Sequence, residues 1–249
     1  GKKKGGIKVH SVIQANEGVP CDVQFTSAAT HDSFMLAPSY YNHKDIVALD
    51  RAYINYAKFE ELTERGVVYV TKMKKNLKFE VLADYIYQNP QGLMQDREQV
   101  VVFRKDGINH VARLITYVDT QKAKSPKLVS LLTNDFDMSI ETIIDIYRQR
   151  WQIELLFKQI KQNFPLRYFY GESENAIKIQ IWVTLIANLL LSVLQSSIER
   201  RWSFSGLATI VRIVLMYYLN LERFLNNPDA DARNLLLEAS ESPPVNTEN

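Results

Sequence analysis

The sequence predicts an α/β protein in which a mixed sheet is flanked by helices. A short apolar run at residues 46–49 leads directly into Asp50, and a helical pattern follows at residues 53–64, which is the strand-then-helix order of α/β domains. Several runs between residues 66 and 135 alternate apolar and polar side chains, as strands do. Long segments with helical periodicity occupy the C-terminal half of the chain.

The first predicted elements form a hairpin. Residues 7–13 and 21–29 have strand composition, and Asn, Glu and Gly at residues 16–18 predict the turn between them. His10 is interpreted as a strand residue, and His31, His43 and His110 as loop or surface residues. None of the four has metal-ligand spacing with Cys21, so neither zinc nor a thiol nucleophile is predicted.

Asp50 is placed at a strand end by its neighbours. The run at residues 46–49 has the length of a short buried strand, and the helix at residues 53–64 that follows is stopped by Gly66. Sites in open α/β sheets lie at the carboxyl ends of strands. Asp50 is therefore a candidate site residue.

Further strands are predicted at residues 67–71, 99–104, 111–118 and 128–133. Lysines gather in the turns of this block, at Lys72, Lys74, Lys75, Lys78, Lys122, Lys124 and Lys127. Two explanations stay open for them. They contact phosphates, or they only solubilise the edges of the sheet.

The C-terminal half is predicted to be helical. Ser139 is a suitable N-cap for a helix over residues 140–163, which Pro165 ends. A second helix is predicted over residues 207–225, and residues 236–249 are predicted to be a disordered tail.

The segment at residues 176–199 is apolar enough to raise the alternative of a membrane span. Polar side chains recur in it every four residues, at Gln180, Thr184, Asn188, Ser192 and Ser196. This stripe favours a buried core helix over a membrane span.

Composition limits the class of protein. Of the 249 residues, 46% are hydrophobic, which is enough for one large domain or one domain with an insertion. The net charge of +2 is only weakly basic, so a nucleic-acid partner has to be argued from local patches. With Cys21 as the only cysteine and no visible secretory signal, we expect a cytoplasmic protein and no membrane association.

Four polar residues stand out in the helix predicted over residues 140–163. At about 100° per residue, Tyr147, Arg150, Glu154 and Lys161 fall within a sector of about 60° beside the apolar face. This stripe suits a site that holds a metal ion and grips a polyanion. The alternative is a solvated amphipathic helix with Glu-to-Lys pairs.

The carboxylates of Asp50 and Glu154 suggest a metal site. Oxygen ligands suit Mg²⁺ or Mn²⁺, and two such ions could promote in-line phosphoryl transfer. The predicted catalytic and metal-binding residues are therefore Asp50 and Glu154. Candidate contacts to DNA are Tyr147, Arg150, Lys161 and Arg51, through phosphates or by stacking.

Three motifs carry a resemblance to a known family. Tyr147, Arg150, Glu154 and Lys161 match the Y-x2-R-x3-E-x6-K pattern, and the chain in this respect resembles the DDE-type bacterial insertion-sequence transposases. The Asp50–Arg51 pair is similar to the end of a strand in that family, and residues 6–10 (Gly-Ile-Lys-Val-His) resemble an early strand of its core. The resemblance covers residues 6–225 approximately.

The resemblance implies a ribonuclease H-like core at residues 6–235, with a β-rich insertion at about residues 66–135 before the glutamate helix. It implies cleavage and strand transfer at transposon ends, with two Mg²⁺ or Mn²⁺ ions in the complete site. The implied partner is double-stranded DNA, bound by a possible homodimer in a synaptic complex.

The chain departs from the family pattern in its carboxylates. The family has three, and its first Asp lies on a strand upstream of the segment that begins here at Gly1; Asp22 and Asp32 are in the wrong place for that role. We therefore expect an N-terminally truncated chain that is inactive alone. The alternatives are a catalytically inactive DNA-binding transposase remnant and a membrane-associated helical protein.

Overall fold

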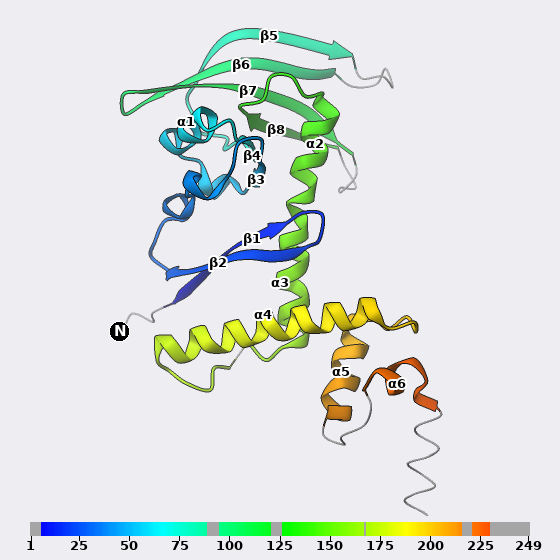
Figure 1. Cartoon of the computed structure of the whole chain (residues 1–249). Coiled ribbons are helices and arrows are strands. Elements are labelled where there is room, and N and C mark those ends of the chain that lie inside the picture. Colours follow the sequence, from blue (N-terminus) through cyan, green and yellow to red (C-terminus); the bar gives the residue numbers. More distant parts are fainter. Residues whose placement is uncertain (1–5, 89–94, 121–125, 167, 216–220, 230–249) are drawn as a thin grey trace, which may run out of the picture. The chain divides into compact units, whose positions relative to one another are not determined.

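The computed structural model describes residues 6–88, 95–120, 126–166, 168–215 and 221–229. The chain divides into two compact units, Gly1–Leu155 and Leu156–Asn249. All the strands belong to the first unit of this described part (Figure 1). The predicted tail at residues 236–249 and the last residues of the predicted core, 230–235, lie outside the described residues.

Six strands of the first unit form one mixed sheet in the order β3-β4-β8-β7-β6-β5. β3 and β4 pair in parallel, whereas the other neighbours in this sheet pair antiparallel. Along the sheet the strands are β3 (Ile46–Leu49), β4 (Val68–Lys72), β8 (Lys127–Thr133), β7 (Ile108–Asp119), β6 (Gln95–Lys105) and β5 (Glu80–Gln88). The predicted mixed sheet is therefore confirmed.

Helices pack against both faces of this sheet, and two adjacent residues of β4 show how. Tyr69 belongs to the core that contains Phe59 of α1 (Tyr56–Glu64), and the two rings stack with their centroids 4.0 Å apart. Val70 belongs to the other core, with Ile143 of α2 (Ile140–Gln149). Since successive strand residues point to opposite faces, α1 and α2 flank the sheet on its two sides.

The predicted hairpin is confirmed as a separate two-stranded sheet. β1 (Ile7–Gln14) pairs antiparallel with β2 (Val19–Ser27). Gly18 in the turn has a φ of +66°, a left-handed conformation that glycine adopts without strain.

Two predicted helices have different bounds in the structure. Asn55 accepts a hydrogen bond from the Lys58 amide and so begins α1 at Tyr56, after a short 3-10 turn, η3 (Arg51–Tyr53). The helix predicted over residues 140–163 is divided at Arg150 into α2 and α3 (Trp151–Asn163). The Arg150 amide bonds to the carbonyl of Tyr147, three residues back, so the chain tightens at this point.

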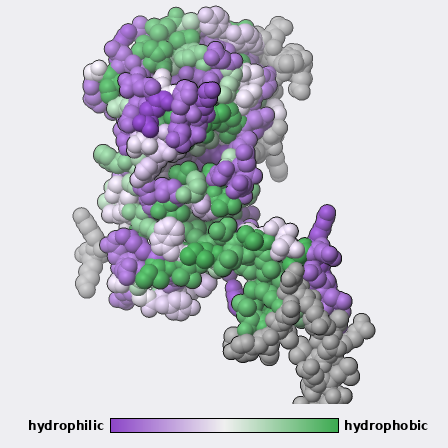
Figure 2. Space-filling view, in the orientation of Figure 1, coloured by the Kyte–Doolittle hydropathy of each residue, from purple (hydrophilic) through white to green (hydrophobic). Residues whose placement is uncertain are grey.

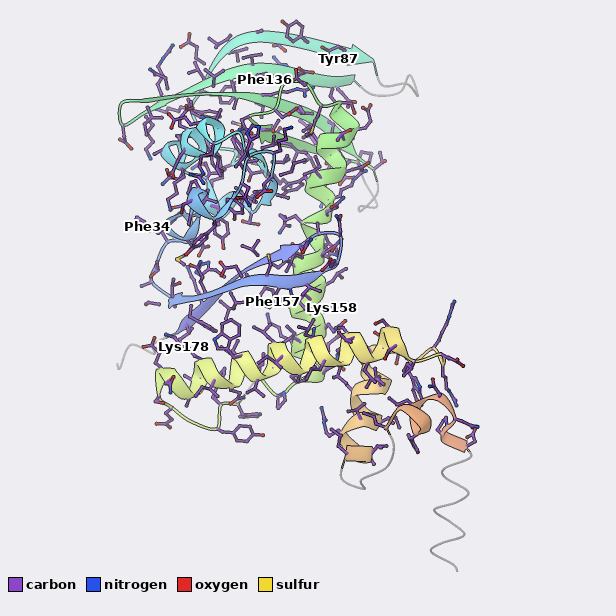
Figure 3. The ribbon with its side chains drawn as sticks, in the orientation of Figure 1. Phe34, Tyr87, Phe136, Phe157, Lys158 and Lys178 are labelled. Atoms are coloured by element: carbon purple, nitrogen blue, oxygen red, sulfur yellow. The ribbon has the colours of Figure 1, made fainter. Side chains whose placement is uncertain are left out.

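Strand β5 was missed by the sequence analysis. It is an edge strand of the sheet, and its large apolar side chains are exposed at successive as well as alternate positions, at Val81, Leu82, Tyr85, Ile86 and Tyr87. Figure 3 labels Tyr87 on this strand. An edge strand with apolar residues on both faces lacks the period of two that identified the other strands.

The second unit contains the rest of α3 together with α4 (Glu174–Ser197), α5 (Phe204–Val214) and α6 (Leu221–Asn226). α5 and α6 lie in the range predicted as one helix, and residues 216–220 between them are outside the described residues. Leu207 of α5, Leu225 of α6 and Ile198 form a small hydrophobic core.

The prediction that α4 is a buried core helix is wrong. Two residues of its polar stripe face inward: Thr184 and Asn188 are only 6% and 5% exposed, and Asn188 Oδ1 accepts a hydrogen bond from Gln159 Nε2 at 3.0 Å. Its apolar stripe is exposed at Ile179, Trp182, Val183, Ile186, Leu189, Leu190 and Val193, which gives the green band in Figure 2. By length and composition α4 could cross a membrane, and 17% of its most apolar window is buried.

His110 is buried in β7, which corrects its placement in a loop or on the surface. Its side chain is 0% exposed, its Nε2 lies 2.6 Å from the hydroxyl of Tyr69, and its Nδ1 contacts the carboxylate of Glu60 on α1. Burial lowers the pKa of His110, and the opposing effect of Glu60 does not cancel this. The imidazole therefore links α1, β4 and β7 in its neutral form.

The buried imidazole predicts acid sensitivity. Below about pH 6.5, the ordinary histidine pKa, the unfolded chain binds a proton that folded His110 resists, so stability falls until the lowered folded pKa is reached. Replacing His110 by Gln should reduce the fall in the urea midpoint between about pH 7.5 and 5.5. Some pH dependence should remain, because the pKa of His10 is also lowered by burial. If the urea midpoint fell equally with pH in the wild-type protein and in the His110→Gln variant, this prediction would be contradicted.

Candidate functional site

The parallel pairing of β3 and β4 brings their carboxyl ends side by side. Asp50 follows β3 directly, and Lys72 is the last residue of β4. A cavity of about 320 Å³ opens at this edge of the sheet, where open α/β sheets carry their ligand sites. Its lining consists of Asp50, Arg51, Lys72, Tyr117, Asp119, Val129, Tyr147, Arg148, Arg150 and Trp151.

The carboxylate of Asp50 has two different surroundings. Its Oδ1 accepts a hydrogen bond from the amide of Ala52 at 2.9 Å, which caps the 3-10 turn η3. Its Oδ2 lies 3.7 Å from Nη1 of Arg150. The turn therefore binds one oxygen, and the other oxygen faces Arg150, which also lines the cavity.

The guanidinium of Arg150 contacts both of the predicted catalytic carboxylates. Its Nη2 donates to Oε1 of Glu154 at 2.6 Å, while its Nη1 faces Asp50. Burial lowers the pKa of Arg150, but the hydrogen bond to Glu154 and the charges around it, including Asp50, raise the pKa overall. Nε of Arg150 is buried without a hydrogen-bond partner in the part of the chain that the structure describes.

The ring of Tyr147 packs against this guanidinium. Its side chain packs against the hydrophobic core on the α2 face of the sheet, and the guanidinium carbon of Arg150 lies 5.5 Å from the centre of its ring. Burial raises the pKa of Tyr147. A half-buried ring in this position stabilises Arg150 by a cation–π contact.

The other predicted DNA contacts fall in different places. Arg51 is exposed and lines the cavity beside Asp50. Lys161 is exposed on α3 in the second unit, so its part in the site stays a prediction. Of the turn lysines within the described residues, only Lys72 lines the cavity. Lys122 and Lys124 lie outside the described residues.

The donor set at the sheet edge fits a hard divalent cation. The side chains of Asp50 and Glu154 are 47% and 40% exposed and share Arg150 as counter-ion. Mg²⁺ is commonly held by one or two carboxylates, with water and phosphate oxygens completing its shell. Across the described residues no group of three or more His, Cys, Asp or Glu side chains is placed to hold a metal, so any ion here would have few protein ligands.

Comparison with known proteins decides the family. The family described as "Transposase DDE domain" matches residues 1–190. The chain belongs to this DDE transposase family. The resemblance inferred from the sequence motifs is thereby confirmed, and the mixed sheet flanked by helices agrees with the ribonuclease H-like fold of these transposases.

Three curated transposases are similar to the chain. A probable transposase for insertion sequence element IS5377 of Geobacillus stearothermophilus is 25% identical over 82% of the chain. A putative transposase for element IS4SA of Synechocystis sp. is 30% identical over 76%, and the putative transposase y4zB of Sinorhizobium fredii is 26% identical over 76%. The chain spans about half of each of these relatives, 53% of their length.

Sequence reasoning missed five residues that line this DDE transposase cavity, namely Tyr117, Asp119, Val129, Arg148 and Trp151. Asp119 and Tyr117 enter the lining because β7 ends at the same edge as β4, and Arg148 lies 4.0 Å from Asp119 and 3.0 Å from Asp145. The position of Asp119 at the end of a predicted strand was a usable signal. Which strands share an edge depends on the sheet order, and the sequence does not state this order.

The contact between Arg150 and Glu154 predicts measurable coupling. In a double-mutant cycle with Arg150→Gln and Glu154→Gln, urea denaturation should give a coupling of about 0.5–1 kcal/mol, since one partner is largely buried. The matched cycle with Arg148→Gln and Asp145→Asn removes an ion pair that is more exposed and should give less. Coupling near zero at Arg150–Glu154 would show that this ion pair does not hold the site together.

Proposed function

We propose that Asp50 and Glu154 bind Mg²⁺ or Mn²⁺ in a transposase that cleaves transposon ends and transfers the strands. The observation that carries the proposal is the convergence of both carboxylates on the guanidinium of Arg150, at the carboxyl edge of parallel strands. Arg150 holds the carboxylates of Asp50 and Glu154 next to one positive charge. A metal ion that took the place of this charge would be bound by both carboxylates. The match to the DDE family supports this assignment.

Each residue has a distinct part in the proposed chemistry. When bound, divalent ions supply charge stabilisation at the attacking and leaving oxygens of the phosphoryl group. Asp50 and Glu154 would hold them through the carboxylates that now contact Arg150. Arg150 neutralises the two carboxylates until a phosphate enters and then binds that phosphate, since a guanidinium fork matches phosphate geometry.

The proposed substrate is double-stranded DNA, bound mainly through its phosphates. Arg51 and Lys72 line the cavity, and neither has a carboxylate partner among the described residues. Tyr147 acts through Arg150, and Lys161 of α3 is a further proposed phosphate contact. Binding to a second copy in a synaptic complex, and a cytoplasmic location without membrane insertion of α4, belong to the same proposal.

Salt dependence tests the DNA contacts. Replacing Arg150 and Lys161 by Ala should reduce the slope of log affinity against log salt by up to about two phosphate contacts. Arg104→Ala with Lys105→Ala is a charge-matched control at the β6–β7 turn, far along the sheet from Asp50, and should leave the slope nearly unchanged. Unchanged affinity and slope in the Arg150 and Lys161 variant would mean that these cations are a solvated face.

A polypeptide of residues 1–249 should nick DNA poorly. Two protein carboxylates leave one ion held mostly by water and phosphates, and a misplacement of about 1 Å can cost on the order of a hundredfold in rate. Within the described residues no group of three or more His, Cys, Asp or Glu side chains is placed to hold a metal ion, which favours, as second candidate, a DNA-binding chain without catalysis. Mg²⁺-dependent nicking of a transposon-end duplex, compared with Glu154→Gln, separates the two. Robust nicking that depends on Glu154 would overturn the prediction and the second candidate.

A further inference from the structure

The motif at residues 6–10 has no part in the proposed chemistry, yet the structure joins it to Asp50. His10 of β1 is 9% exposed. Its Nε2 lies 2.8 Å from Oγ1 of Thr26 on β2, and its Nδ1 lies 2.9 Å from the hydroxyl of Tyr53. The His10 and Tyr53 rings meet edge to face, with centroids 6.2 Å apart.

Tyr53 ends the turn that Asp50 begins. The amide of Tyr53 donates to the backbone carbonyl of Asp50 at 3.0 Å, and the amide of Ala52 donates to Oδ1 of Asp50 at 2.9 Å. The 3-10 turn is therefore fixed at one end by the aspartate itself and at the other by the bond to His10. Rotation of this turn would change the direction in which Oδ2 of Asp50 points.

The hairpin that carries His10 is itself anchored. Lys8 is two residues from His10 and so lies on the same face of β1. Its ammonium donates to the carbonyl of Thr30 at 2.8 Å and contacts Asp32 at 3.0 Å. The support for Tyr53 therefore comes from a braced two-stranded sheet.

The protonation states suit this arrangement. Burial lowers the pKa of His10, against a smaller effect of Asp32 that raises it, so the ring is neutral at pH 7. Burial raises the pKa of Tyr53 to about 12, so its hydroxyl keeps its proton. A neutral imidazole has one donor and one acceptor nitrogen, so it satisfies Tyr53 and Thr26 at the same time.

We propose that His10 and Tyr53 are positioning residues that fix the carboxylate of Asp50 for divalent-ion binding. The proposal rests on the proposed function of Asp50 as a metal ligand. Mutation of a group that orients a metal ligand without touching the ion commonly lowers metal affinity by about 10- to 100-fold. Neither residue touches the reacting atoms, so they act only through Asp50.

The test is the affinity of the 249-residue chain for Mn²⁺ alone, followed by electron paramagnetic resonance of the free ion. Tyr53→Phe keeps the ring and removes only the hydroxyl bonded to His10. It should weaken Mn²⁺ binding on the order of tenfold. His10→Phe should weaken it equally, and the double variant should add little, because both changes break one contact.

A closely matched control exists in the same unit. Tyr69→Phe also removes a buried phenol–imidazole hydrogen bond, the 2.6 Å contact with His110. It should lower the midpoint of thermal unfolding and leave the Mn²⁺ affinity unchanged. An effect on affinity in Tyr53→Phe alone therefore reports positioning of Asp50 and not a general loss of stability.

The outcomes separate this inference from the proposed function. Loss of Mn²⁺ binding in Asp50→Asn and Glu154→Gln, with wild-type affinity in Tyr53→Phe, overturns the inference alone. Wild-type affinity in Asp50→Asn and Glu154→Gln overturns the metal site itself. If circular dichroism shows that Tyr53→Phe is unfolded, Thr26→Val replaces it, with an expected weakening of about two- to threefold. Wild-type Mn²⁺ affinity in the Thr26→Val variant would also overturn the inference.

Discussion

The ion pair network of Arg150 with Asp50 and Glu154 is the interaction on which the site depends. Asp50 arrives from a strand end and Glu154 from a helix more than a hundred residues later, and one guanidinium contacts both. Without that cation, the two negative charges would have no counter-ion between them and would repel each other. The cation–π contact with Tyr147 and the break between α2 and α3 at Arg150 both serve to place this guanidinium.

The predicted β-rich insertion is continuous with the core sheet. β8 pairs with β4, so the strands from β5 to β8 extend the sheet that carries Asp50. The Asp50 edge therefore shares its hydrophobic cores with the insertion, on the α1 face and on the α2 face. Tyr117 and Asp119 are the residues of β7 that line the cavity and so link the insertion to the site.

Much of the fold follows from local patterns. The hairpin, β3 and the position of Asp50 at its end were predictable, because turn residues and short apolar runs fix them. β5 was not, since an edge strand with apolar residues on both faces lacks alternation. The surroundings of α4 were not predictable either: its polar stripe indicates a buried core helix, whereas in the structure Thr184 and Asn188 face inward and the apolar stripe is exposed. The pairing of His10 with Tyr53 required the tertiary structure, because the two residues are 43 positions apart.

The most direct test of the shared site is anomalous diffraction from crystals of the chain soaked in Mn²⁺. If the two carboxylates share a metal site, an anomalous peak is expected within about 2.0–2.6 Å of a carboxylate oxygen of both Asp50 and Glu154, with the Arg150 guanidinium moved away from Asp50. A peak at other residues only, with Asp50, Arg150 and Glu154 still paired, would contradict it.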